Sequence, residues 1–195
     1  MIIDEWFCTP IAQFKNENDF NLTEHCLKIK EEYESGAHWI HSPYNTLTSG
    51  RGAGYNIGSD SKFDELTDWI VECVNEFAKA CGYSPVRLYN GWFNVYEKGD
   101  SQEFHNHKGS QFSCVYYLDV KDNDSKLHFN RSPFPMIEYK ILENNRINSD
   151  EVWYQPFKGL LLVFKSDTLH MVERKKTNDI RISISYNFKE FNNDR

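Results

Sequence analysis

The stretch RISISYNF, residues 181–188, decides the fold class, because polar and apolar side chains alternate along it without interruption. Successive side chains of a β-strand point to opposite faces of its sheet. The pattern therefore predicts a strand with one face in an apolar core and the other towards something polar. Arg181 and Ser183 fall on the polar face, where a guanidinium group is costly unless it has an anionic partner.

Six further segments before this strand are rich in β-branched and aromatic residues, and clusters of Gly, Pro, Asn and Asp separate them. We predict strands at residues 87–96, 113–120, 126–130, 136–141, 152–154 and 160–164. Many short strands in succession are typical of a β-sandwich or jelly roll.

Two amphipathic helices are expected before the strands. Leu22, Cys26 and Ile29 recur at helical spacing after Asn21, a favourable N-cap residue, and a second apolar stripe runs over residues 63–77. We expect both helices to pack on one sheet of a mainly β (α+β) fold. The chain is predicted to be a single domain, residues 1–195, with a helical and loop part at 1–85 and a jelly-roll core at 86–190.

The composition excludes several classes of protein. With 195 residues, of which 15% are aromatic, the chain can fill a substantial core, and a net charge of -7 disfavours coating of nucleic acid. No apolar run approaches the roughly 20 residues that span a bilayer, and no secretory leader is expected. Five cysteines without a CxxC pair fit a reducing compartment, so we expect a cytoplasmic protein that does not contact membranes.

His105 and His107 are the first candidates for chemistry. Residues two apart on an extended strand point to the same face, so both imidazoles can converge on one point. His170, which follows the apolar run at 160–164, is the expected third ligand of a facial metal site with open coordination positions. On the H-x-H spacing alone, two ordinary structural histidines stay an alternative.

Around these histidines the sequence resembles the Fe(II)/2-oxoglutarate-dependent oxygenases, and within them a small 2OG-Fe(II) oxygenase group of bacteria and phages. The blocks that carry the resemblance cover residues 6–11, 92–117 and 159–187. Its motifs are Asn94-x-Tyr96-x-x-Gly99, His105-x-His107, the distant His170 and Arg181-x-Ser183.

The resemblance implies a double-stranded β-helix (jelly roll) and a dioxygenase that hydroxylates a substrate while 2-oxoglutarate is decarboxylated to succinate. It implies Fe(II) ligands at His105, His107 and His170, with O2 as the oxidant. The usual second ligand is Asp or Glu, but this chain has His107. Either His107 completes an all-histidine triad, which we favour, or it is displaced and water fills its place. His128 is a less favoured substitute ligand.

The resemblance also implies a 2-oxoglutarate site, in which Arg181 holds the C5 carboxylate with the help of Ser183, and Asn94 and Tyr96 contact the co-substrate. No catalytic residue is assigned beyond the metal site.

The prime substrate is left open between a protein side chain, a nucleobase and a small metabolite. Arg51 and Tyr55, on a glycine-rich segment, and Arg131 are candidate substrate contacts, although both arginines also fit solvated surface charges. Strand edges of a jelly roll often pair, so a homodimer is also considered.

Two other functions fit part of the pattern. One is a cupin-like three-His metalloenzyme that does not use 2-oxoglutarate, but cupins place a Glu where Gln111 or Phe112 stands here. The other is a non-catalytic jelly-roll binding module that exposes aromatic residues such as Trp39 and Trp92.

Overall fold

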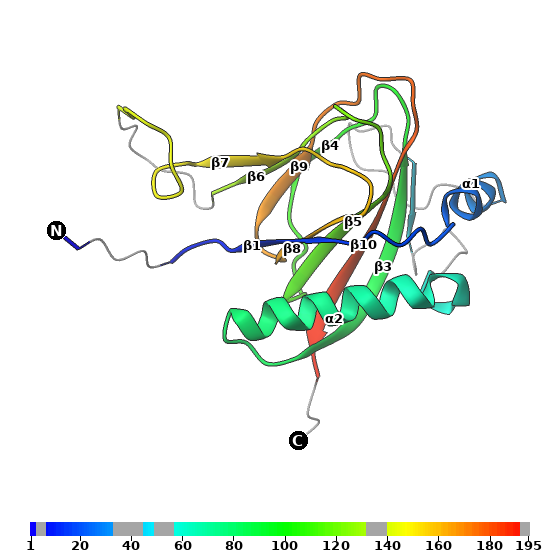
Figure 1. The fold of residues 1–195 in the computed structure, drawn as a ribbon, viewed down its shortest axis with the longest axis horizontal. Coiled ribbons are helices and arrows are strands. Elements are labelled where there is room, and N and C mark those ends of the chain that lie inside the picture. The colour runs from blue at the N-terminus through cyan, green and yellow to red at the C-terminus, as the bar shows by residue number, and fades with distance from the viewer. Residues whose placement is uncertain (3–6, 33–44, 49–56, 132–139, 192–195) are drawn as a thin grey trace.

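The computed structural model describes residues 1–2, 7–32, 45–48, 57–131 and 140–191 (Figure 1). Its strands form two antiparallel sheets, which confirms the mainly β, jelly-roll prediction. In spatial order, the larger sheet contains β1 (Ile11–Lys15), β8 (Leu160–Lys165), β5 (Phe112–Asp119), β10 (Arg181–Glu190), β3 (Val86–Tyr96) and β2 (Asn45–Thr48). The smaller sheet contains β4 (Gln102–His105), β9 (Leu169–Val172), β6 (Leu127–Asn130) and β7 (Glu151–Tyr154).

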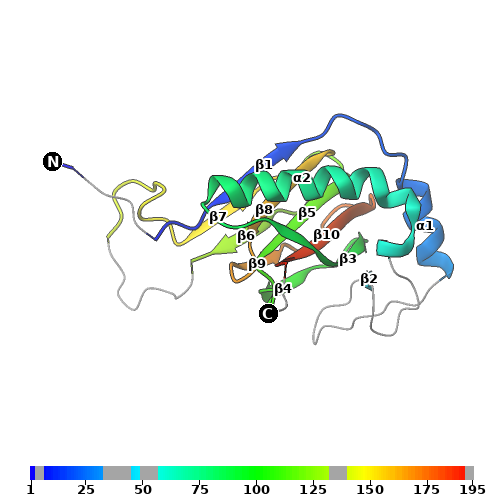
Figure 2. The same ribbon diagram turned by 90° about the horizontal axis from the view of Figure 1, so that it is seen from below.

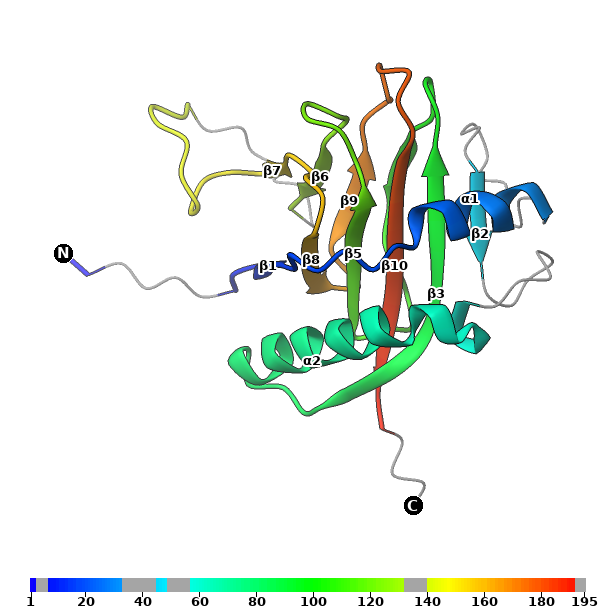
Figure 3. The same ribbon diagram turned by 45° about the vertical axis from the view of Figure 1, so that its right-hand side comes forward.

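Two helices pack on one face of the larger sheet, as predicted. They are α1 (Thr23–Glu32) and α2 (Asp64–Ala80), and Figure 3 shows both in front of that sheet. Figure 2 shows α2 lying along the sheet. Two short 3-10 turns, Ile57–Ser59 and Ser61–Phe63, lead into α2. No helix in the described ranges is both long and apolar enough to cross a bilayer.

The strand β10 separates two environments, because its side chains alternate between them. Ile182 and Ile184 point into the main apolar core, where they pack with helix residues such as Ile70. Arg181 and Ser183 point the other way, into a pocket between the two sheets. The alternation in RISISYNF thus has the predicted consequence: one face is core and the other lines a polar cavity.

Strand pairing places the segments that carry the polar residues next to one another. Ser183 of β10 lies in register with Asn94 of β3 on one side and with Tyr117 of β5 on the other. In the smaller sheet, His105 of β4 is paired with His170 of β9. Residues that are far apart in the sequence therefore face the same space between the sheets.

Several strand predictions need correction. Three strands were not expected, β1, β2 and β9, and β4 ends at His105, short of the strand expected to carry both His105 and His107. Of the strand predicted at 136–141, residues 136–139 lie outside the described part of the chain, and 140–141 are not in a strand. The unexpected strands are four or five residues long, too short to show a clear alternation.

Candidate active site

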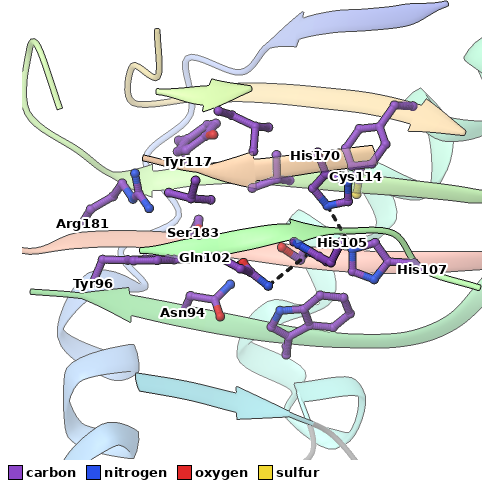
Figure 4. Close-up of a pocket in the computed structure, with 16 residues that line it drawn as sticks. Asn94, Tyr96, Gln102, His105, His107, Cys114, Tyr117, His170, Arg181 and Ser183 are labelled. Carbon is purple, nitrogen blue, oxygen red and sulfur yellow. Dashed lines mark hydrogen bonds between the residues drawn. The ribbon is translucent and has the colours of Figure 1, made fainter. Parts of the chain in front are cut away.

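A pocket lies between the two sheets, and both sheets contribute to its wall (Figure 4). The three histidines lie at one end and Arg181 at the other. The predicted residues that line it are Asn94, Tyr96, His105, His107, His170, Arg181 and Ser183. The sequence therefore selected residues that the fold brings together, although it did not anticipate the rest of the wall.

The ring nitrogens of His105, His107 and His170 converge, and one nitrogen from each lies within 4.8 Å of the others. The Nε2 atoms of His107 and His170 are 3.2 Å apart. The prediction that His105 and His107 share a strand is wrong, because β4 ends at His105. The backbone N–H of His107 instead donates to the carbonyl oxygen of Ser166, at 2.8 Å, which fixes this segment beside the pocket.

Backbone carbonyl groups orient two of the three imidazoles. The Nδ1 atom of His105 lies 2.8 Å from the carbonyl oxygen of Glu103, and Nδ1 of His170 lies 2.9 Å from that of Thr168. A carbonyl oxygen can only accept, so each Nδ1 carries the proton and the lone pair of each imidazole is on Nε2. Such outer hydrogen bonds are typical of histidines that bind metals.

Burial keeps these imidazoles neutral. It lowers the pKa of His105, and it lowers the pKa of His107 to about 3, with a further contribution from His105. The pKa of His170 is lowered well below its usual value, first by burial and then by the other two histidines. Neutral imidazole is the form that binds metal ions.

The donor set fits a divalent transition metal. Three neutral nitrogen donors suit iron and its neighbours in the first transition series. The Nε2 atoms of His107 and His170 are close enough to share a hydrogen bond in one tautomer of His107, and in the other tautomer both lone pairs point to one position that a cation can occupy.

At the other end of the pocket, Arg181 is only 1% exposed. Its guanidinium carbon lies 4.0 Å from the ring centre of Tyr96, and its Nη1 donates to the carbonyl oxygen and Oγ of Ser125, at 3.0 and 2.7 Å. Its Nε is buried and has no hydrogen-bond partner among the described residues. A buried donor without a partner is costly, and a bound anion would satisfy it.

The buried carboxylate of Asp124 also lies near Arg181, and nothing in the sequence indicated it. Oδ1 of Asp124 lies 3.8 Å from Nη1 of Arg181, while Oδ2 of Asp124 accepts a hydrogen bond from the buried Lys175. Burial alone would raise the pKa of Asp124, but the hydrogen bond from Lys175 and the charge of Arg181 hold it below its usual value. The three charged side chains form one buried cluster behind the pocket.

Tyr117 and Gln102 also line the pocket and were missed. Tyr117 is 2% exposed, and burial raises its pKa, so it is a neutral phenol. Gln102 links the two ends of the site, because its Oε1 accepts from the hydroxyl of Tyr96 and its Nε2 lies 3.2 Å from Nε2 of His105. Tyr117 falls within the strand predicted at 113–120, but its immediate neighbours there are apolar or aromatic, and no local pattern in the sequence distinguished it as a pocket residue.

The remaining candidates lie away from this pocket. His128 does not line it; its Nδ1 contacts the carboxylate of Glu151, and its Nε2 lies 3.0 Å from Oε1 of Glu173. Arg131 is exposed, with Nη1 3.7 Å from Oδ1 of Asp150. Arg51 and Tyr55 lie outside the described residues.

The comparisons with known proteins agree with this geometry. Residues 90–187 match the family model described as "Putative 2OG-Fe(II) oxygenase". No curated protein matches the sequence.

Solved structures show the same fold at low identity. A Pseudomonas putida prolyl-4-hydroxylase is 15% identical, with a TM-score of 0.64 over 93% of this chain and 92% of that one. A Trichoplax adhaerens prolyl hydroxylase, in complex with a hypoxia inducible factor peptide fragment, is 14% identical, with a TM-score of 0.62 over 92% and 83%. HygX from Streptomyces hygroscopicus, with nickel, 2-oxoglutarate and hygromycin B bound, is 12% identical, with a TM-score of 0.65 over 94% and 84%.

Proposed function

Because the chain belongs to the 2OG-Fe(II) oxygenase family, we propose that the pocket between its two sheets is the active site of an iron- and 2-oxoglutarate-dependent hydroxylase. One observation carries the proposal: a single pocket has three convergent imidazole nitrogens at one end and a buried guanidinium group at the other. The first end suits a metal and the second suits the distal carboxylate of a dicarboxylic acid.

The Nε2 atoms of His105, His107 and His170 would hold Fe(II). With O2 and 2-oxoglutarate, the bound iron supplies the oxidising chemistry, in which the 2-oxo acid loses CO2 to give succinate and one oxygen atom is transferred to the substrate. The carbonyl oxygens of Glu103 and Thr168 keep two of these imidazoles turned towards the metal position.

We take His107 as a true ligand rather than a displaced residue. Its Nε2 lies 3.2 Å from that of His170, at the point where the donors converge. An all-histidine site carries one more unit of positive charge than a site with two histidines and a carboxylate. It therefore attracts an anionic chelator more strongly.

Arg181 would bind the C5 carboxylate of 2-oxoglutarate through its unused donor, with the hydroxyl of Ser183 beside it. Tyr117, a neutral phenol opposite Ser183 in the strand pairing, is added to this set as a hydrogen-bond donor. Asn94 and Tyr96 line the pocket beside them, on the neighbouring strand β3, in register with Ser183 and Arg181. These residues hold the co-substrate in one orientation and exclude water, since most of them are fully buried.

The substrate class stays open between a protein side chain, a nucleobase and a metabolite. Arg51 and Tyr55 remain candidate contacts to it, whereas the ion pair of Arg131 with Asp150 at the surface favours a solvated charge. We further propose a single domain, a cytoplasmic location, which its free cysteines favour, and a homodimer through an exposed edge strand such as β7.

An uncoupled assay tests the proposal directly. The purified protein is incubated with Fe(II), ascorbate, O2 and 2-oxoglutarate, and succinate is measured with and without candidate substrates. We expect slow succinate formation that requires both iron and 2-oxoglutarate and that is abolished in His170→Ala. Succinate formation that is unchanged in Arg181→Ala would contradict the role given to Arg181, whereas a protein that binds the metal but forms no succinate would favour the cupin-like alternative. Absence of any binding of metal or 2-oxoglutarate would favour the binding module.

A further inference from the structure

Three charged side chains are packed together behind the pocket, and only one of them faces it. Arg181 lines the pocket, whereas Asp124 and Lys175 do not. The side chains of Asp124 and Lys175 are 0% exposed, and that of Arg181 is 2% exposed. Two cations therefore share one buried carboxylate, and the cluster keeps a net charge of +1.

The hydrogen bonds of Asp124 show that it pairs with Lys175 more closely than with Arg181. Its Oδ2 accepts from Nζ of Lys175. Its Oδ1 accepts from the backbone N–H and the hydroxyl of Ser125, at 2.6 and 2.9 Å. Nη1 of Arg181 lies 3.8 Å from Oδ1, beyond hydrogen-bond distance, and donates to Ser125 instead. Asp124 thus compensates Lys175 first, and the charge of Arg181 is left for another anion.

Lys175 is fixed in this role by the backbone around it. Its N–H donates to the carbonyl oxygen of Asp100, its carbonyl oxygen accepts from Gly99, and its Nζ also donates to the hydroxyl of Thr177. If Lys175 only stabilised the fold, an apolar pair would do as well, since replacing a buried ion pair by apolar residues is often neutral. The pair of Asp124 and Lys175 has a function if it sets the charge that Arg181 presents to the pocket.

We propose that Lys175 is a positioning residue for co-substrate binding: by engaging Asp124, it keeps the guanidinium group of Arg181 available for the distal carboxylate of 2-oxoglutarate. This inference rests on the proposed function. Without Lys175, the only charged partner left to Asp124 in the cluster is Arg181, and the buried cluster becomes neutral.

A pair of variants separates this role from a structural one. Lys175→Met leaves Arg181 as the only cation in the cluster that can compensate Asp124, so we expect it to raise the Kd for 2-oxoglutarate by about tenfold or more. The double variant Asp124→Asn, Lys175→Met removes both charges and leaves Arg181 as the only cation. We therefore expect the double variant to regain an affinity close to that of the wild type.

The experiment is an anaerobic calorimetric titration of the Mn(II)-loaded protein with two acids. 2-Oxoglutarate is compared with 2-oxopentanoate, which has the same chain length but no distal carboxylate. Lys175→Met should weaken only the binding of 2-oxoglutarate, and in turnover it should raise KM with little change in kcat. Lys158→Met, at an exposed ion pair with Asp19, is the matched control and should change neither affinity.

Each result decides the question. Recovery of affinity in the double variant supports the proposal, even if Lys175→Met alone does not fold. Wild-type affinity in a folded Lys175→Met, an equal loss for both acids, or a double variant that binds 2-oxoglutarate as weakly as the single one overturns it. If the wild type itself binds no 2-oxoglutarate, the proposed function fails. If the wild type binds 2-oxoglutarate but the variants do not rank in affinity as expected, only the role of Lys175 fails.

Discussion

The two ends of the pocket lie on the same largely buried wall but hold groups of opposite chemistry: neutral imidazoles at one end and a cation at the other. At the histidine end, burial lowers the pKa values, so the three imidazoles are neutral and present lone pairs. At the arginine end, the guanidinium group of Arg181 is a permanent cation, which donates to Ser125 and lies over the ring of Tyr96. Burial therefore prepares one end for a cation and the other for an anion, and substitutions should affect the two ends separately.

The largest effect is expected at the histidine end. His170→Ala removes one of three ligands together with its link to the carbonyl oxygen of Thr168. We expect metal binding to fall by more than about 100-fold, since even the loss of a second-sphere partner costs 10 to 100-fold. Metal content after reconstitution measures this. His128→Gln is the control, because His128 lies outside the pocket, and an equal loss there would contradict the assignment.

The next largest effect is expected at the arginine end. Arg181→Ala removes the buried cation, and we expect the Kd for 2-oxoglutarate to rise by about 100-fold or more while metal affinity is retained. Calorimetry with Mn(II) and with 2-oxoglutarate measures both quantities. If Arg181→Ala lost the metal as well, the two ends would not be independent.

A smaller effect is expected from a substitution that alters the charge of the histidine end without removing a ligand. His107→Asp introduces a carboxylate at the histidine end, so the metal should still bind, through two histidines and one carboxylate. The site becomes one unit less positive, and we expect 2-oxoglutarate affinity to fall on the order of tenfold. Loss of the metal in this variant would mean that the backbone at His107, where β4 has already ended, cannot place a shorter ligand.

The smallest effect is expected from Ser183→Ala. The hydroxyl supplies one hydrogen bond to a carboxylate, so we expect the Kd for 2-oxoglutarate to rise about fivefold, equivalent to about 1 kcal/mol. The affinity for metal and for 2-oxopentanoate should be unchanged. A change in metal affinity would show that Ser183 supports the histidine end instead.

The sequence predicts features that depend on neighbouring residues better than features that depend on contacts between distant segments. The alternation in β10 is local, so it correctly assigned Ile182 to the core and Arg181 to a polar cavity. The spacing of His105 and His107 predicts one strand, yet β4 ends at His105, and the backbone N–H of His107 donates to Ser166, outside the strand pairing.

Features that depend on contacts between distant segments have no recognisable pattern in the local sequence. Strands β4 and β9 are recognisable only once they pair with each other at His105 and His170. Asp124 and Lys175 are 51 residues apart and stand in loops, where acidic and basic residues are usually solvated. Only the packing of both loops behind Arg181 makes them a buried pair.

The most direct test of the central claim is whether one pocket binds a metal and 2-oxoglutarate together. 2-Oxoglutarate is titrated anaerobically into metal-free and Mn(II)-loaded wild-type protein, His170→Ala and Arg181→Ala. We predict one equivalent of 2-oxoglutarate, bound tightly only by the metal-loaded wild type, and weakened by loss of either end. Binding that does not depend on the metal, or that survives Arg181→Ala unchanged, would contradict the account.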